Sequence, residues 1–152
     1  MLDLDGQYTF SAPQDVVWAA LQNPRLLGTI IPTCWGVESI GLNKYRGILK
    51  FAAGPMSGIF EGQIELSNIQ EPDSYDIVVS GKAPIGIVRI TGGMNLESVD
   101  DNHTTMHYRG TVTFGGRIAS VGSRLLEMAI NAMVRQSFEA LNQYFITIKN
   151  RL

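Results

Sequence analysis

Residues 56–67 read MSGIFEGQIELS, and apolar and polar side chains alternate along them. Phe60, Ile64 and Leu66 fall on one side of this alternation, and glutamates and a glutamine fall on the other. Successive side chains of a β-strand point to opposite faces, so this pattern predicts a strand with one face buried. Gly58 and Gly62, however, occupy the apolar side, where a strand usually carries a branched side chain.

The same pattern recurs along the chain, because glycines occupy the apolar side of five predicted strands. They are Gly6, Gly58, Gly62, Gly81, Gly92 and Gly110. Glycine in a strand marks a bend or a close approach by another group. Two interpretations therefore stay open: the glycines only bend the sheet so that a helix packs closer, or they leave room inside it for an apolar guest.

Alternation and turn residues predict seven strands, at residues 2–10, 34–41, 44–53, 56–70, 73–83, 85–99 and 103–114. The connections between the last six are short and carry turn residues such as Gly54-Pro55, so neighbouring strands should pair as antiparallel hairpins. After the first strand, Ser11 is the expected N-cap of a short helix, Asn23-Pro24 interrupts it, and a second short helix ends at Pro32.

From residue 117 the hydrophobic period changes from two to about 3.6, and no proline interrupts residues 117–150. This predicts one long amphipathic helix whose wide apolar side needs a large partner, which only the sheet provides. The fold class is therefore α+β: a curved antiparallel sheet of about seven strands wrapped around a long C-terminal helix, with two short helices after the first strand.

The composition indicates a single domain over residues 1–152, with a net charge of −2. A nucleic-acid partner is not expected, because such proteins usually concentrate basic residues on one face. Cys34 is the single cysteine, so no internal disulfide forms. No signal segment and no apolar run long enough to span a bilayer is visible, so a cytoplasmic location is expected.

Catalytic and metal chemistry finds little support in the residues. His103 and His107 lie on a predicted strand and face water, and Glu61 and Glu65 lie on an outer face that would not separate their pKa values. Cys34 has no histidine near it in sequence, so a small half-buried residue at a strand start is the preferred interpretation. We therefore expect no catalytic residue and no metal ligand.

An apolar ligand site is favoured instead, because flexible methionines join the glycines on the inward side. The expected lining comprises Phe60, Ile64, Ile77, Val79, Ile90, Met94, Met106, Tyr108, Leu126, Ala129 and Met133. Trp35 and the 26–32 loop are the expected lid, and Tyr108 is the expected hydrogen-bond donor to a ligand oxygen.

Three segments resemble a known family. They are Gly6 to Asn23-Pro24 with Ser-Ala-Pro-Gln-Asp-Val-Val-Trp at 11–18, Leu27 with Ile-Pro-Thr-Cys at 31–34, and Gly-Gly-Arg-Ile-Ala-Ser-Val-Gly-Ser-Arg-Leu at 115–125 running into a helix with Phe138. Over nearly the whole chain the sequence resembles the CoxG family, the G subunits of carbon monoxide dehydrogenase, which belongs to the START-like (SRPBCC) helix-grip superfamily. Thr33 stands where that family usually has glycine, so the loop beside the pocket mouth is expected to differ.

The resemblance implies a non-enzymatic protein that holds a hydrophobic small molecule between sheet and helix. It also implies association with a molybdenum-containing carbon monoxide dehydrogenase or related hydroxylase, recruitment of that enzyme to the inner face of the cell membrane, and a bound quinone or lipid in place of a covalent cofactor.

Our principal hypothesis is a carrier of an isoprenoid quinone or similar lipid. A ligand-free docking module for a partner enzyme or a membrane surface is the first alternative, and it would use exposed apolar residues near Leu26, Leu27, Ile30 and Ile31. A cyclase or hydratase of the same superfamily is the second, and it would require ionisable groups inside the fold. Arg89 and Arg109 are both predicted to point outward.

Overall fold

The computed structural model describes residues 1–151, which form one sheet and the helices that cover it. The strands are β1 (Leu2–Phe10), β2 (Cys34–Gly41), β3 (Lys44–Ala53), β4 (Met56–Gln70), β5 (Ser74–Ala83), β6 (Gly86–Asp100) and β7 (His103–Gly115). The helices are α1 (Gln14–Leu21), α2 (Pro24–Ile30) and α3 (Ser123–Asn150), with a 3-10 turn η1 (Arg117–Val121) before α3. The α+β class and the order of elements are as the sequence predicts.

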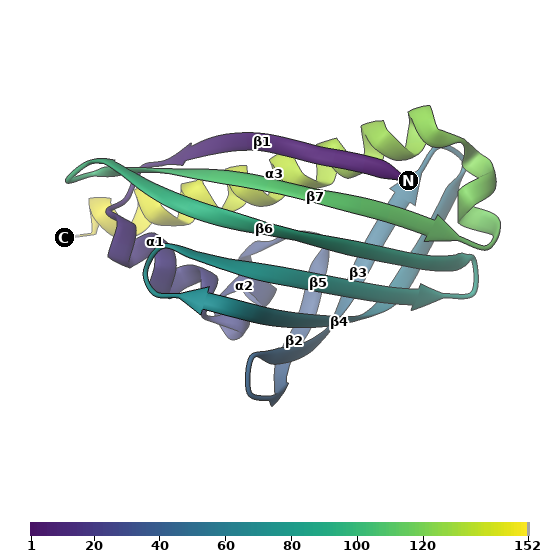
Figure 1. Ribbon diagram of the computed structural model, residues 1–152, viewed down its shortest axis with the longest axis horizontal. Helices are drawn as coiled ribbons and strands as arrows, with labels where there is room; N and C mark the ends of the chain where they lie inside the picture. Colours follow the sequence, from purple (N-terminus) through teal and green to yellow (C-terminus); the bar gives the residue numbers. More distant parts are fainter. Residues whose placement is uncertain (152) are drawn as a thin grey trace.

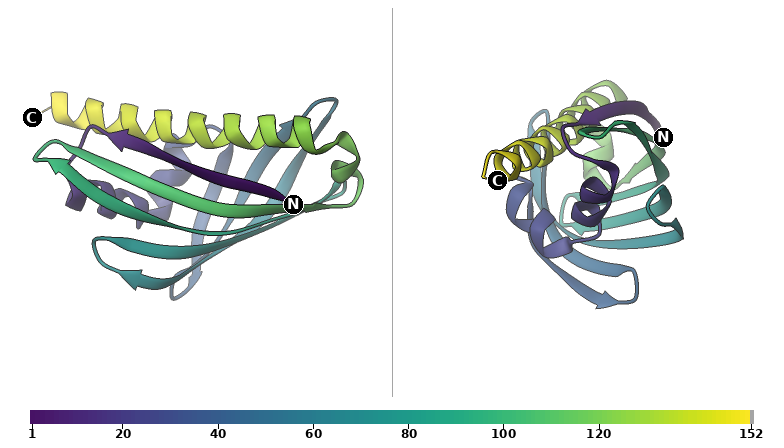
Figure 2. Two further views of the ribbon diagram at one scale, coloured as in Figure 1. Left: turned by 45° about the horizontal axis from the view of Figure 1, so that its top comes forward. Right: turned by 90° about the vertical axis from the view of Figure 1, so that its left-hand side faces the viewer.

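The seven strands form one antiparallel sheet in the order β1-β7-β6-β5-β4-β3-β2. Each of β2 to β7 pairs with its neighbour in the chain, and β1 closes the series by pairing with β7. The sheet curves, and α3 runs along its open side while α1 and α2 fill one end (Figures 1 and 2). The hollow side of the sheet therefore faces the helices, which is the helix-grip arrangement.

The short helices begin where the sequence provides suitable residues, with one exception. The Asn23 side chain accepts a hydrogen bond from the Leu26 amide at 3.1 Å and caps α2, and Pro24 occupies the first turn of that helix. Ser11 does not cap α1: the residue before that helix is Pro13, and the Ser11 amide donates to Asn142 Oδ1 at 2.7 Å. Ser11 instead ties the end of β1 to α3.

The C-terminal helix starts later than the sequence predicts. Residues 117–121 form the 3-10 turn η1, and Gly122 adopts φ +102°, a conformation that interrupts the helix. The remaining 28 residues form an unbroken α3. Because Ile118 of η1 is fully buried, the turn anchors the start of α3 against the sheet.

The buried residues form two clusters, one toward each end of α3. The first surrounds Phe10 and includes Trp18, Tyr75 and Phe145. The second surrounds Phe60 and includes Phe51, Val88, Leu126 and Ile130. The space between sheet and helix is filled around Phe10, whereas the cluster around Phe60 borders an open cavity.

Candidate functional site

An apolar cavity of about 200 Å³ lies between the inner face of the sheet and α3. Its walls are almost entirely hydrocarbon, and its floor contains the glycines of three adjacent strands. The complete lining is Ile31, Thr33, Cys34, Gly47, Ile48, Leu49, Phe51, Phe60, Gly62, Ile64, Val79, Gly81, Val88, Ile90, Ile130, Met133 and Ser137. The Ser137 hydroxyl donates to the Met133 carbonyl oxygen at 2.8 Å, so it offers its proton to the helix and not to the cavity.

The glycine floor runs straight across β3, β4 and β5. Gly47 lies opposite Gly62, and Gly62 lies opposite Gly81. A Cβ atom at Gly62 would meet nothing closer than the Gly47 carbonyl oxygen at 3.6 Å, an ordinary contact. A side chain at Gly62 would therefore begin without a clash beside the cavity that Gly62 lines, and the interpretation of a hollow sheet holds at this position.

Other inward glycines have different roles. A Cβ at Gly6 would overlap the Tyr108 hydroxyl, and one at Gly58 would overlap the end of Ile85. At Gly92 it would overlap the Arg109 carbonyl oxygen, which belongs to the neighbouring strand. Side chains or backbone thus occupy the space at these positions, and the interpretation of close approach holds for them.

A second cavity of about 120 Å³ adjoins the first beneath α1 and α2. Ile31, Cys34 and Ile64 line both cavities. Tyr45 and Tyr75 line the second cavity, whose remaining walls are mainly aliphatic. Burial raises the pKa of the Cys34 thiol above its usual range, so this group at the junction is a neutral thiol.

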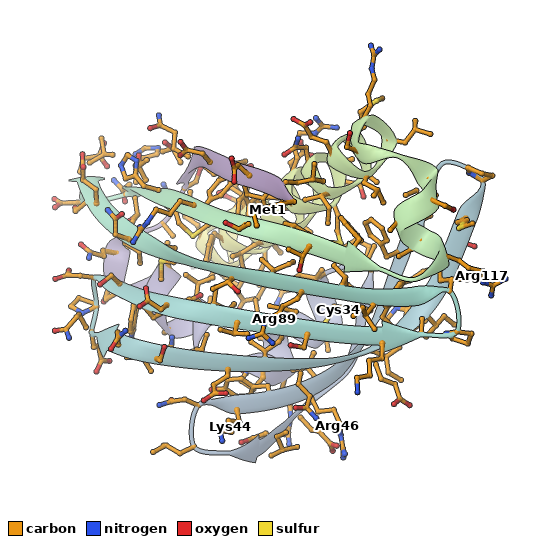
Figure 3. All side chains as sticks on the ribbon, turned by 45° about the vertical axis from the view of Figure 1, so that its right-hand side comes forward. Met1, Cys34, Lys44, Arg46, Arg89 and Arg117 are labelled. Carbon is orange, nitrogen blue, oxygen red and sulfur yellow. The ribbon has the colours of Figure 1, made fainter. Side chains whose placement is uncertain are left out.

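A surface groove adjoins the larger cavity on its other side, between the start of β2 and α3. Thr33, Phe51 and Met133 line both the groove and the larger cavity. Trp35, Ala129 and Ala132 border the groove, and the Trp35 side chain is 44% exposed. Cys34 lies among the side chains in the middle of the molecule, whereas Lys44 and Arg46 lie at its outer edge (Figure 3).

The twelve residues expected to contact a ligand fall into four groups. Phe60, Ile64, Val79, Ile90 and Met133 line the larger cavity, Ile77 lines the smaller one with Ile64, and Trp35 and Ala129 border the groove with Met133. Met94, Met106, Leu126 and Tyr108 lie outside these three spaces, packed in the two core clusters. A role in ligand binding stays a prediction for all twelve.

Tyr108 is placed differently from the sequence-based expectation. Its hydroxyl lies over Gly6, and its ring packs against Phe138 with centroids 5.2 Å apart. Gly47, Cys34, Phe51 and Ile130 line the larger cavity although they were not among the expected residues. The alternation along β3 places Gly47 on the inward face with Tyr45, so the signal that identified the other glycines could have identified this one.

The histidines, glutamates and arginines considered for chemistry are not among the residues that line the two cavities. Arg89 and Arg109 are exposed, as expected. His103 Nδ1 lies 2.9 Å from Asp100 Oδ1, and His107 Nε2 lies 3.6 Å from Glu97 Oε2, both at the surface. Within residues 1–151, no cluster of histidine, cysteine and carboxylate groups is arranged to hold a metal ion, and no helix is both long and apolar enough to cross a membrane.

Two further expectations concern the loop at 26–34. Leu26, Leu27 and Ile30 were expected to offer an exposed docking surface, but they are half-buried against the cluster around Phe10. Thr33, which replaces the family's usual glycine, has no positive φ, so the backbone there suits any residue. A threonine is therefore accommodated at the edge of the cavity without strain.

A curved antiparallel sheet that grips a long helix around an internal cavity defines the START-like class of helix-grip proteins. A START superfamily protein from Mycobacterium smegmatis has this fold, with a TM-score of 0.74 at 9% identity over 96% of this chain and 98% of that one. Residues 6–146 match the family model of CoxG, the G subunit of carbon monoxide dehydrogenase. The chain belongs to the CoxG family.

Two solved structures extend the comparison. A conserved protein from Geobacillus kaustophilus is 25% identical, with a TM-score of 0.90 and 96% of each chain covered. The ZhuI aromatase/cyclase from a Streptomyces species is 14% identical, with a TM-score of 0.71 over 95% of this chain and 93% of that one. The second likeness shows the fold alone. No curated protein matches the sequence.

Proposed function

We propose that this protein is a non-enzymatic carrier that holds a neutral hydrophobic ligand, an isoprenoid quinone or a similar lipid, in the cavity above the glycine floor. The open space at Gly62 is the observation that carries this proposal, because it is walled by hydrocarbon and no protein side chain fills it. An apolar cavity of about 150 Å³ stays dry and binds benzene. The larger cavity, at about 200 Å³, has room for a ring or a short length of chain.

The adjoining groove extends this space toward solvent. A long isoprenoid chain exceeds the volume of the internal cavities, so the part beyond its first units would lie in the groove between Trp35 and Ala132. Burying apolar surface contributes about 25 cal/mol per Å² before ordering costs are subtracted. The affinity would therefore come mainly from hydrocarbon contact.

Catalysis of the cyclase type is not favoured by the groups that face the cavities. General acid–base catalysis needs a positioned group that titrates near neutral pH. The lining residues of both cavities include no carboxylate, imidazole or amine. Family membership supports association with a carbon monoxide dehydrogenase, for which the carrier would accept or deliver the ligand.

Transfer at a membrane surface is the second part of the proposal. Three apolar side chains are exposed beside the groove: Trp35, Leu125 and Met128, which is 61% exposed. Leu125 and Met128 precede Ala129 and Ala132 by one helical turn, on the groove side of α3. Tryptophan favours the interface of a bilayer. We therefore expect the groove to contact lipid, and the variant Trp35→Ala/Met128→Ser to float less with liposomes than the original protein.

The carrier proposal is tested by filling the cavity. Gly62→Leu places a leucine side chain in the open space, and Gly41→Leu, on exposed β2, is a matched control. We expect Gly62→Leu to keep the circular dichroism spectrum and to lose at least about tenfold in affinity for a short-chain menaquinone, while Gly41→Leu binds normally. Native mass spectrometry should also detect a co-purified lipid. Unchanged binding by Gly62→Leu, or no uptake by the original protein, contradicts the proposal.

A further inference from the structure

The smaller cavity differs from the larger one in its polar groups. Tyr45 from β3 and Tyr75 from β5 both reach it, and its other walls come from residues such as Leu21, Leu27 and Leu66. Tyr45 is close enough to Tyr75 to add to the rise in the Tyr75 pKa that burial causes. Two tyrosines thus line one end of an otherwise hydrocarbon interior.

The hydroxyl of Tyr75 lacks a protein partner. Its side chain is only 9% exposed, and its ring is held against Trp18 with centroids 5.8 Å apart. Among residues 1–151 no hydrogen bond to this hydroxyl is present, and burial and a nearby phenol are the only influences on its pKa. Buried tyrosine hydroxyls usually have a partner. Tyr75 lines the smaller cavity, so an acceptor for its hydroxyl would come from whatever occupies that cavity.

The protonation state of Tyr75 limits what it can bind. Burial, with a smaller contribution from Tyr45, raises its pKa far above the usual range, so the phenol stays neutral and keeps its proton. A neutral O–H donor complements an oxygen acceptor such as a carbonyl. A carboxylate would also accept, but no lysine, arginine or histidine lines this cavity to balance its buried charge. The site therefore selects a neutral carbonyl over an ionised acid.

We propose that the smaller cavity receives the carbonyl end of the ligand and that the Tyr75 hydroxyl donates a hydrogen bond to the carbonyl oxygen. This inference rests on the proposed carrier function and specifies the ligand as an uncharged carbonyl compound with an apolar remainder. The remainder passes Ile31, Cys34 and Ile64, which line both cavities, and occupies the space above the glycine floor. Tyr75, not Tyr108, is the residue that orients the ligand.

The test compares two small ligands of nearly the same shape. Duroquinone carries two carbonyl groups on a methylated ring, and durene is the corresponding hydrocarbon. Tyr75→Phe removes only the hydroxyl and keeps the contact with Trp18. We expect this variant to bind duroquinone about fivefold more weakly and durene within about twofold of the original protein. The carbonyl stretching band of bound duroquinone should also move to higher frequency in the variant. Tyr108→Phe is the matched control and should change neither affinity.

Each outcome separates this inference from the carrier function. If the original protein binds both ligands and Tyr75→Phe weakens neither, or weakens both equally, the carbonyl site is wrong and the carrier stands. A loss of duroquinone binding in Tyr108→Phe alone also overturns the assignment. If the original protein binds neither ligand, the carrier function itself fails. A further pair, decanoate and methyl decanoate, tests the charge argument: the ester should bind more tightly at neutral pH, and equal or tighter binding of the acid contradicts it.

Discussion

Gly6 of the edge strand β1 and Gly62 of the interior strand β4 both lie on the inward face of the sheet, yet only Gly62 borders the larger cavity. Tyr108 covers Gly6 from the strand beside it, and the rings of Tyr8, Phe10, Phe138 and Phe145 continue the packing with neighbouring centroids 4.9 to 5.9 Å apart. Gly62 instead lies between two further glycines. A missing side chain therefore becomes a cavity only where the neighbouring strands also lack side chains to fill it.

The largest expected difference between the halves concerns their central phenylalanines. Phe10 and Phe60 are both fully buried, but Phe10 is enclosed by other rings and Phe60 borders the cavity. We expect Phe10→Ala to lower the free energy of unfolding by about 3–5 kcal/mol. Phe60→Ala should cost about 1 kcal/mol less, because a ring beside empty space makes fewer contacts. Urea unfolding of both variants measures the difference, and an equal cost would mean that the cavity is filled in solution.

A second comparison adds one methyl group at a closely packed glycine and one at a glycine beside the cavity. Gly92→Ala brings a Cβ into the backbone of β7, so we expect it to destabilise the protein by about 1–3 kcal/mol. Gly62→Ala adds its methyl to open space and reduces the freedom of the unfolded chain, which should stabilise the protein by about 0.5 kcal/mol. Thermal unfolding distinguishes them. A destabilised Gly62→Ala would show that the floor of the cavity is more tightly packed than described.

The order and the bounds of the strands follow from local sequence with few errors. Apolar alternation fixes which face of β4 is buried, and turn residues such as Gly54-Pro55 fix where β3 ends. The long helix was less well predicted at its start, because an apolar period of 3.6 continues through Ile118 and Val121 although Gly122 breaks the helix between them and α3. Periodicity reports which side chains are buried, and it does not report the backbone angle of a single glycine.

The kind of site could be predicted from the sequence, whereas the residues that line it could be predicted only in part. Alternation assigns Tyr108 and Met94 to the inward face, and both are on that face. Whether an inward residue meets the cavity depends on which part of α3 lies opposite, and that depends on the curvature of the sheet. Tyr75 shows the same limit: its inward direction was clear, but its unpartnered hydroxyl became visible only once α1 and Trp18 were placed against it.

The two halves also differ in how their stability responds to alkaline pH, because one of them contains Tyr75, which lies beside the smaller cavity. Its pKa is raised in the folded protein and is about 10 in the unfolded chain, so the unfolded chain loses this proton first. Stability from this group is nearly complete below pH 9 and falls as the unfolded chain loses the proton, with a slope that approaches about 1.4 kcal/mol per pH unit above pH 11. Tyr75→Phe removes this slope. Urea unfolding of the original protein and of the variant at a series of alkaline pH values measures the difference between their free energies of unfolding. A difference that stays constant with pH contradicts the burial of Tyr75.

The smallest expected effect concerns the rate at which Cys34, at the junction between the cavities, is alkylated. Burial raises the pKa of Cys34, so the reactive thiolate is scarce at neutral pH and its alkylation by iodoacetamide should be slower than that of an exposed thiol. Ser39→Cys in a Cys34→Ala background supplies that exposed thiol on the same strand. The rate at Cys34 should rise with pH and fall further when duroquinone is bound, since Cys34 lines both cavities. If duroquinone also slowed the alkylation of the thiol in Ser39→Cys, the protection of Cys34 would be a general effect and not a sign of binding at the junction. If Cys34 were alkylated equally fast with and without bound duroquinone, the ligand would lie elsewhere.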